Sequence, residues 1–164
     1  MEHLDAPKKI YWDSCVWLAL INEEVGRVER CKYVISEARK GNVQIWTSTL
    51  TLAEVFRRKC SETWVELPES KDSDFENYLE QEFFVVAQLD VDLGVLSRRL
   101  LRQHSELKKP PDGIHLATAA FHNVDEMHTF DDENLTPLSG KINRSDGVAL
   151  VICHPPEDPE PLLI

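Results

Sequence analysis

Four acidic residues, each beside a short apolar segment, are the residues of this sequence best suited to chemistry: Asp13, Glu54, Asp112 and Asp131. Carboxylate oxygens are the ligands that hard divalent cations such as Mg²⁺ prefer. Four carboxylates held close together repel one another strongly unless a cation lies between them. A fold that gathers them would therefore form a metal centre able to activate water and to neutralise charge on a phosphate.

Each of the four acids also has a simpler explanation as a helix-capping residue. Aspartate is among the best N-caps, which accounts for Asp13, Asp112 and Asp131 one at a time. Thr51 and Glu54 have the spacing of a capping box. Caps have no reason to gather at one end of a sheet, so the two explanations differ in where the fold places these residues.

The elements that must position the acids alternate between two hydrophobic periodicities. Strands are expected over 9–12, 43–46, 83–89, 126–130 and 148–153, and helices over 16–21, 28–38, 47–60, 93–101 and 112–121. This alternation predicts an α/β fold with a mostly parallel sheet that is covered on both faces. Ligands in such folds collect at the carboxyl ends of the strands, and Asp13 and Asp131 both follow a strand.

The length of 164 residues predicts a single domain over residues 1–154, followed by a Pro-rich tail over 155–164 that is expected to be an extended arm. Residues 61–82 hold eight acidic residues and one basic residue. We expect this acidic excursion to be solvated and partly helical rather than part of the core.

The net charge of −11 means that the chain has no global field that attracts nucleic acid. Contacts with nucleic acid would depend on local clusters of basic residues. Such clusters are Arg57, Arg58 and Lys59 after Glu54, and Arg98, Arg99, Arg102, Lys108 and Lys109 before Asp112.

No uncharged apolar run reaches the roughly 18 residues of a membrane span. The four cysteines form no C-x-x-C motif, so we expect reduced thiols and a cytoplasmic protein.

Other residue types that carry chemistry are expected to be structural. Trp12, Trp17 and Trp46 lie in apolar segments and should pack in the core, whereas Trp64 lies in the acidic excursion and should be exposed. His115, His122 and His128 lack the thiolate pairs or the H-E-x-x-H pattern of a transition-metal site. The sequence also has no G-x-S-x-G elbow and no glycine-rich phosphate loop.

Four segments together resemble a known family, and the resemblance extends from about residue 10 to residue 153. They are YWDSCVWL at 11–18, LAEVF at 52–56, DGIHLATA at 112–119 and HTFD at 128–131. Their order and context are similar to those of the PIN-domain ribonucleases, in particular the bacterial VapC-type toxins.

The resemblance implies a three-layer α/β/α sandwich with a sheet of four to five strands. It implies RNA hydrolysis that depends on Mg²⁺ or Mn²⁺ and leaves a 5′-phosphate and a 3′-hydroxyl. The four acids of the family correspond to Asp13, Glu54, Asp112 and Asp131, with Asp132 as an alternative for the last. The family's hydroxyl group corresponds to Thr129, with Ser14 as a second candidate.

By the same resemblance, Asp13, Asp112 and Asp131 are the expected direct metal ligands, and Glu54 binds a second ion or acts as the general base. The implied partners are an RNA substrate, a small antitoxin protein and a second copy of the chain. The alternative is a non-catalytic PIN-like module that binds RNA or protein. The presence of all four acids favours the nuclease. A phosphoaspartate enzyme is disfavoured because Ser14 and Cys15 follow Asp13 where an Asp-x-Asp motif is needed.

Overall fold

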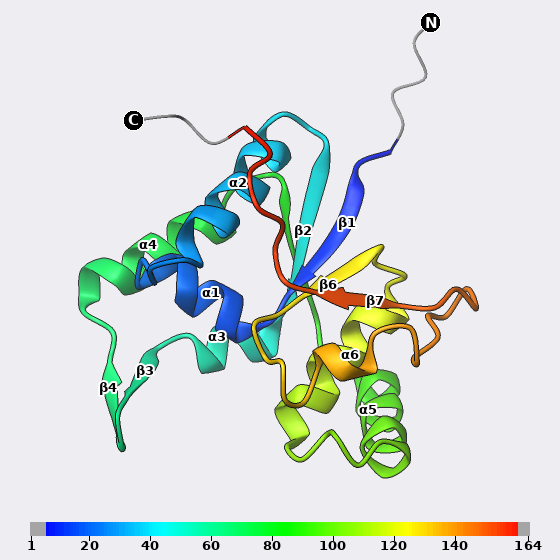
Figure 1. Cartoon of the computed structure of the whole chain (residues 1–164). Helices are drawn as coiled ribbons and strands as arrows, with labels where there is room; N and C mark the ends of the chain where they lie inside the picture. The colour runs from blue at the N-terminus through cyan, green and yellow to red at the C-terminus, as the bar shows by residue number, and fades with distance from the viewer. Residues whose placement is uncertain (1–5, 161–164) are drawn as a thin grey trace, which may run out of the picture.

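A computed structural model describes residues 6–160 of the chain (Figure 1). Its centre is a five-stranded sheet with the order β5-β2-β1-β6-β7, in which every neighbouring pair of strands is parallel. The strands are β1 (Lys8–Trp12), β2 (Val43–Ser48), β5 (Phe84–Ala87), β6 (Glu126–His128) and β7 (Val151–Cys153). The predicted α/β fold with a parallel sheet of four to five strands is therefore confirmed.

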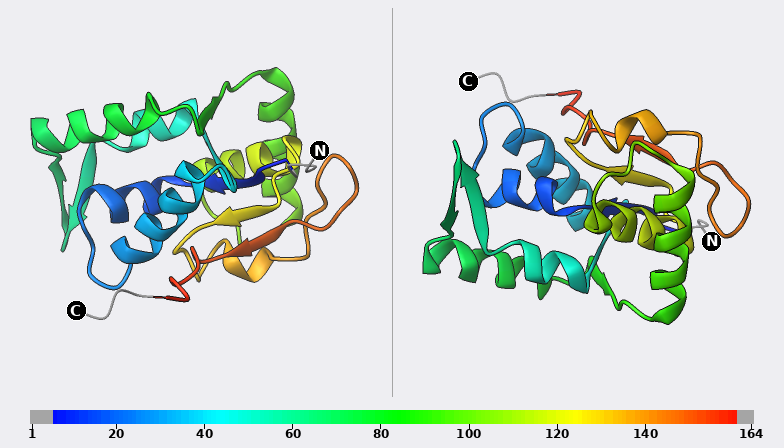
Figure 2. Two further views of the ribbon diagram at one scale, coloured as in Figure 1. Left: turned by 90° about the horizontal axis from the view of Figure 1, so that it is seen from above. Right: turned by 90° about the horizontal axis from the view of Figure 1, so that it is seen from below.

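Helices cover the sheet on both faces and make three layers (Figure 2). One face packs against α1 (Ser14–Ile21), α2 (Val28–Arg39) and α4 (Glu69–Leu79), and the other against α5 (Val91–Gln103) and α6 (Pro110–Phe121). The short helix α3 (Thr49–Glu54) follows β2, and a 3₁₀ turn, η1 (Thr136–Leu138), lies between β6 and β7.

Strand β1 is the central strand, and its side chains alternate between the two cores. Ile10 and Trp12 pack with α1 and α2, whereas Tyr11 packs with α5 and α6. Trp12 is fully buried and meets Trp17 of α1 edge to face, with 5.4 Å between ring centroids. Trp12 and Trp17 therefore lie in the core as predicted, Trp46 is half-buried, and Trp64 is exposed.

The prediction of a helix over 47–60 is wrong beyond Glu54. Helix α3 ends there because Val55 adopts φ −86° and ψ 65°, and the Phe56 N–H bonds to the Glu54 carbonyl in a tight turn. The chain then forms β3 (Arg57–Cys60), which pairs antiparallel with β4 (Thr63–Glu66). Only two residues, Ser61 and Glu62, connect the two strands. We call these two strands and their turn the β3–β4 hairpin.

The expectation that residues 61–82 lie outside the core is also wrong for part of this segment. The segment is partly helical, as predicted, but α4 buries Phe75 against Trp17, with 5.0 Å between the ring centroids. Leu67 is buried as well. Phe75, together with the partly buried Tyr78 and Leu79, therefore attaches an otherwise acidic helix to the main core.

The described part of the Pro-rich tail runs along α2 without regular secondary structure. Arg30 of α2 donates to the Pro155 carbonyl at 3.0 Å and forms an ion pair with Glu157. The domain boundary at residue 154 remains a prediction, and residues 1–5 and 161–164 lie outside the described residues. Within residues 6–160, no helix has the length and hydrophobicity needed to cross a membrane.

Candidate functional site

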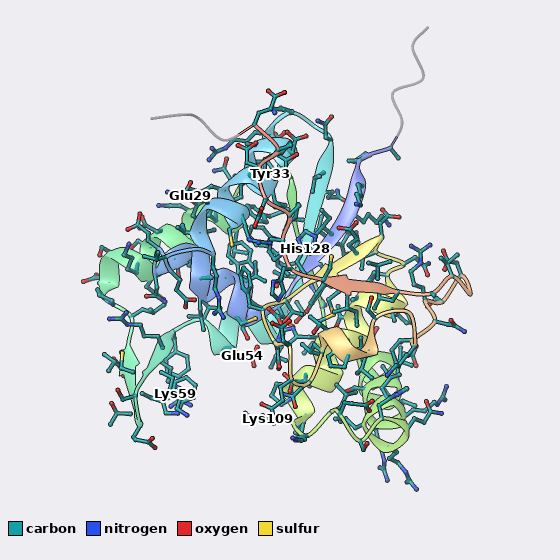
Figure 3. All side chains as sticks on the ribbon, in the orientation of Figure 1. Glu29, Tyr33, Glu54, Lys59, Lys109 and His128 are labelled. Carbon is teal, nitrogen blue, oxygen red and sulfur yellow. The ribbon has the colours of Figure 1, made fainter. Side chains whose placement is uncertain are left out.

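The carboxyl ends of β1 and β6 lie side by side, because the two strands pair in parallel from Ile10 to Trp12. Asp13 follows β1 directly, and the segment Thr129–Asp131 follows β6. Glu54 is the last residue of α3, the short helix that directly follows β2 (Figure 3). Asp112 lies in the first turn of α6. Four separate elements thus bring the four predicted acids to one edge of the sheet.

Asp13 is a buried carboxylate that is surrounded by hydrogen-bond donors. Its Oδ1 accepts from the Val16 backbone N–H at 3.2 Å and from the Cys15 thiol at 2.9 Å. Its Oδ2 accepts from the Thr129 hydroxyl at 2.6 Å. Burial raises the pKa of Asp13 above its ordinary value, and the nearby His115 and these hydrogen bonds oppose that rise.

Thr129 connects the carboxylates at the ends of two neighbouring strands. Its hydroxyl donates to Asp13 and accepts from the backbone N–H of Asp131 at 3.0 Å. The Thr129 side chain is fully buried, so water does not compete for either bond. The predicted site hydroxyl thus contacts two of the predicted acids, whereas Ser14 makes no hydrogen bond to any of the four within residues 6–160.

Asp112 lies among like charges. Burial, together with the negative charges of Asp131 and Asp13, raises the pKa of Asp112 to about 6, and His115 and Lys109 oppose the rise. An ordinary exposed aspartate titrates about two units lower. The ionised form of Asp112 is therefore disfavoured in the metal-free protein. A bound cation would favour the ionised form by neutralising the nearby negative charges.

Glu54 is held by a directed chain of hydrogen bonds. Its Oε2 lies 2.6 Å from His115 Nε2, and His115 Nδ1 lies 2.7 Å from the Tyr11 hydroxyl. Burial raises the pKa of Tyr11 well above its ordinary value, so its hydroxyl keeps its proton and donates to Nδ1. The imidazole then donates from Nε2 to Glu54, which fixes both the tautomer and the rotamer of His115.

Removing the Tyr11 hydroxyl should destabilise this chain of hydrogen bonds. In Tyr11→Phe the buried Nδ1 of His115 loses its donor, and we expect the free energy of unfolding to fall by about 1–3 kcal/mol. Urea unfolding measures the change. Tyr33→Phe is the matched control because the Tyr33 hydroxyl has no hydrogen-bond partner in the described part of the chain. Equal stabilities of the two variants would contradict the hydrogen bonds assigned to Tyr11 and His115.

The capping explanation holds for two of the acids and fails for the other two. Asp13 is the N-cap of α1, and Asp131 accepts the backbone N–H groups of Glu133 at 3.1 Å and Asn134 at 2.9 Å. Asp112 is not a cap, because α6 begins at Pro110. Glu54 bonds to His115 instead of closing a capping box. Asp13 and Asp131 therefore cap their segments and converge with Asp112 at the same time.

The four carboxylates have no basic counter-ions of their own. Within residues 6–160, no lysine or arginine nitrogen lies within 4.0 Å of Asp13, Glu54, Asp112 or Asp131. No three of these carboxylates come within 4.8 Å of one another in the same part of the chain. The metal-free arrangement is thus a loose, uncompensated group of acids.

Comparison with known proteins assigns this parallel-sheet fold to a family. The model of the PIN domain family matches residues 10–136, which include all four acids. This chain belongs to the PIN domain family. No curated protein sequence matches it.

Two solved structures share the PIN fold of this chain. VapC20 from Mycobacterium tuberculosis, a toxin that cleaves the sarcin–ricin loop, is 18% identical with a TM-score of 0.57, and the match covers 74% of this chain and 89% of VapC20. VapBC2 from Rickettsia felis, solved bound to a DNA fragment from its promoter, is 16% identical with a TM-score of 0.51, and the match covers 74% and 86% of the two chains. At these identities the likeness concerns the fold.

The sequence did not reveal that His115 and Cys15 contact the acids of this PIN domain, or that Tyr11 bonds to His115. His115 was expected to be an ordinary histidine, yet its imidazole is 2% exposed and bonds to Glu54. Tyr11 and Cys15 were not predicted to lie near the site. The position of His115 near the acids was predictable, since it lies three residues after Asp112 and therefore on the same helix face. Asp132, the alternative to Asp131, bonds instead to His154 at 2.7 Å.

A second group of potential ligands in the PIN domain, Glu126, His128 and Cys153, has its ligand atoms within 4.8 Å of one another. The Trp12 indole N–H donates to His128 Nδ1 at 3.3 Å, so the proton of the neutral ring lies on Nε2 and points at Glu126, 3.0 Å away. Burial lowers the pKa of His128, and the hydrogen bond from His128 lowers the pKa of Glu126 to about 2. The group therefore fits a hydrogen-bonded link between strands, without a free imidazole lone pair for a metal.

Proposed function

We propose that this PIN domain is an endoribonuclease that depends on Mg²⁺ or Mn²⁺ and acts as the toxin of a toxin–antitoxin pair. The observation that carries the proposal is the convergence of Asp13, Glu54, Asp112 and Asp131 at one sheet edge without basic counter-ions. Carboxylates that only cap helices or balance surface charge do not need such an arrangement.

The donor set fits a hard divalent cation. All the converging side chains offer oxygen, and the acids leave room for coordinated waters, several of which Mg²⁺ usually retains. Asn134 places one further oxygen beside these acids. Its Nδ2 donates to Asp131 at 3.0 Å, and its Oδ1 is buried without a hydrogen-bond partner in the described part of the chain. When bound, such an ion supplies Lewis acidity toward water and neutralises charge on the phosphate.

The residues of the chain would then divide the work. Asp13, Asp112 and Asp131 would hold the ion, and Thr129 would fix the orientation of Asp13 and of the Asp131 backbone. Glu54 has one oxygen bonded to His115, which leaves Oε1 to accept the proton of an attacking water as a general base. A second ion near Glu54 is the other arrangement compatible with this oxygen.

The substrate and the partner follow from the relatives. VapC20 is a toxin that cleaves the sarcin–ricin loop, and the VapC-type toxins that the sequence resembles are ribonucleases with small antitoxin partners. We infer that the phosphodiester substrate of this chain is RNA. We also infer that a small antitoxin protein covers the carboxylate edge and keeps RNA away from it.

Metal dependence provides the test of the proposal. Purified protein should cleave a mixed RNA pool with Mn²⁺ or Mg²⁺ and lose that activity in EDTA. Either ion should also raise the melting temperature, because it binds the folded state alone. An ion at 100 times its Kd adds about 2.7 kcal/mol to the free energy of unfolding.

Controls separate the nuclease from the non-catalytic alternative. The melting temperature is measured again with Ca²⁺ and with the Asp112→Asn variant. These controls show whether a shift caused by Mg²⁺ or Mn²⁺ comes from binding at this site. A metal-dependent melting shift without cleavage of any RNA in the pool would point to a non-catalytic PIN module. The absence of both the shift and the cleavage would contradict the assigned metal site.

A further inference from the structure

The β3–β4 hairpin stands apart from the body of the PIN domain. In Figure 1 it extends away from α3 and α4, on the side of the molecule where β1 ends. All of its residues from Arg57 to Glu66 are exposed except Cys60, which is half-buried. A two-stranded hairpin without further packing is only marginally stable in water. The pairing of these two strands therefore contributes little to the stability of the domain.

The base of the hairpin is fixed beside the carboxylate edge. Val55 and Leu67, which flank the two strands, are both buried, and the Leu67 N–H donates to the Phe56 carbonyl at 2.8 Å. Glu54 lies immediately before this base. The hairpin therefore projects at a defined place next to one of the site acids.

One face of the hairpin combines positive charge with an open aromatic ring. Lys59 and Trp64 lie opposite each other in the strand register and so share a face. The Arg57 guanidinium lies over the Trp64 ring, 4.6 Å from its centroid, which places Arg57 on that face too. Trp64 is 55% exposed, so the indole face that Arg57 does not cover is open to solvent.

The basic residues of the hairpin have no acidic partners in the described part of the chain, although Arg57 contacts the Phe56 and Trp64 rings. None of Arg57, Arg58 and Lys59 makes an ion pair with a residue of the described chain or a side-chain hydrogen bond to one. Glu66 lies opposite Arg57 in register without pairing with it. With three basic residues against Glu62 and Glu66, the hairpin carries a small net positive charge on an acidic protein.

The position of this face relates it to the carboxylates. In the view of Figure 3, Lys59 projects from the side of the hairpin that is turned toward Glu54, and Lys109, at the start of α6, lies on the other side of Glu54. Lys109 is close enough to Asp112 to lower its pKa. Positive charge therefore flanks the carboxylate edge on two sides, from two elements far apart in the sequence.

We propose that the Arg57–Lys59–Trp64 face of the β3–β4 hairpin binds single-stranded RNA next to the cleavage site, with a base stacked on Trp64 and phosphates on Arg57 and Lys59. The inference rests on the proposed ribonuclease function. Base–aromatic stacking combined with lysine and arginine contacts is the usual way in which proteins hold single strands. Tryptophan and arginine are enriched in protein interfaces as well, but lysine is depleted there, so Lys59 is the residue of this face that favours RNA over a protein partner.

The test measures RNA binding in an Asp112→Asn background, so that cleavage does not interfere. A short unstructured RNA should bind this parent and quench its tryptophan fluorescence. Trp64→Ala should weaken binding about tenfold and remove most of the quenching, whereas Trp64→Phe, which keeps a stacking ring, should retain most of the affinity. Lys59→Gln should weaken binding and lower the slope of log Kd against log salt by about one unit or slightly less.

Two matched variants control for the hairpin fold and for total charge. Val65→Ala truncates an exposed side chain on the opposite face of the hairpin, and Lys32→Gln removes a positive charge on α2. Both should bind RNA as the parent does. Because Trp64→Ala can unfold the hairpin, Trp64→Phe and Lys59→Gln keep the test decisive.

The outcomes separate this inference from the proposed function. RNA cleavage by the wild type, together with equal RNA affinity of the parent, Trp64→Ala and Lys59→Gln, overturns the inference and leaves the nuclease intact. Binding that depends on Trp64, without any cleavage by the wild type, supports the inference and counts against the nuclease. A change of oligomeric state in Trp64→Ala at unchanged RNA affinity also overturns the inference, because the face would then contact protein.

Discussion

The Asp112→Asn variant should lose RNA cleavage by at least about a hundredfold while its metal-free form melts at a higher temperature than the wild type at pH 7. Asparagine keeps the shape of the side chain but removes the charge of an expected metal ligand. Losing a partner in the outer shell of a metal site already costs about 10–100-fold. The gain in stability has a separate cause, since the substitution removes a disfavoured negative charge that lies near Asp131 and Asp13.

The pH dependence of this gain follows from the raised pKa of Asp112. The group titrates at about 6 in the folded protein against an ordinary value of 3.8, so the folded state binds its proton more tightly than the unfolded state. Protonation of Asp112 therefore stabilises the fold at low pH, and this contribution is lost as the pH rises through about 6. The melting advantage of Asp112→Asn should be largest at pH 7 and should shrink toward pH 4.

Thermal melts of both proteins in EDTA at several pH values measure this advantage. For a chain of this length, each kcal/mol of relief shifts the melting temperature by about 2–4 °C. Added Mg²⁺ or Mn²⁺ should reverse the order at pH 7, because the ion stabilises only the wild type. A variant that melts below the wild type at pH 7 without metal would contradict the crowding of like charges, and a variant that cleaves at the full rate would contradict the ligand assignment.

The convergence of Asp13 and Asp131 could be predicted from the sequence because it depends on a property of all parallel sheets. Both residues follow strands, and the carboxyl ends of parallel strands meet at one edge. Thr129 lies in the same strand end, so its position followed from that of Asp131. The bond between Glu54 and His115 depends instead on how α6 packs against α3, which hydrophobic periodicity does not encode.

The β3–β4 hairpin and the burial of Phe75 could not be predicted for related reasons. Ala53, Phe56 and Cys60 have helical spacing, and this pattern hid the end of α3 at Glu54. The hairpin turn has a positive φ of 55° at Ser61, where glycine is the usual signal. Phe75 is one aromatic residue among acids, and its burial is decided by the space beside Trp17 rather than by its own segment.

Thr129→Val is the substitution that should most clearly separate the positioning of the acids from their ability to bind metal. Valine has nearly the shape of threonine but cannot donate to Asp13 or accept from the Asp131 backbone N–H. A buried carboxylate then loses a short hydrogen bond, and the half-buried Asp131 N–H loses its acceptor. We expect the free energy of unfolding to fall by about 2–4 kcal/mol and cleavage to fall about 10–100-fold.

Thr129→Ser is the matched control because it keeps the hydroxyl and loses one methyl group, which costs about 1 kcal/mol. It should cleave RNA at nearly the rate of the wild type. If the serine variant were as slow as the valine variant, the effect would come from packing rather than from the hydroxyl.

The response to excess metal distinguishes Thr129 from the ligands it holds. In Thr129→Val the carboxylates of Asp13, Asp112 and Asp131 are all present but less well oriented, so the main loss is in metal affinity. Raising the Mn²⁺ concentration should therefore restore much of the cleavage by Thr129→Val and none of the cleavage by Asp112→Asn. Rescue of both variants, or of neither, would mean that Thr129 does not act by positioning Asp13 and Asp131.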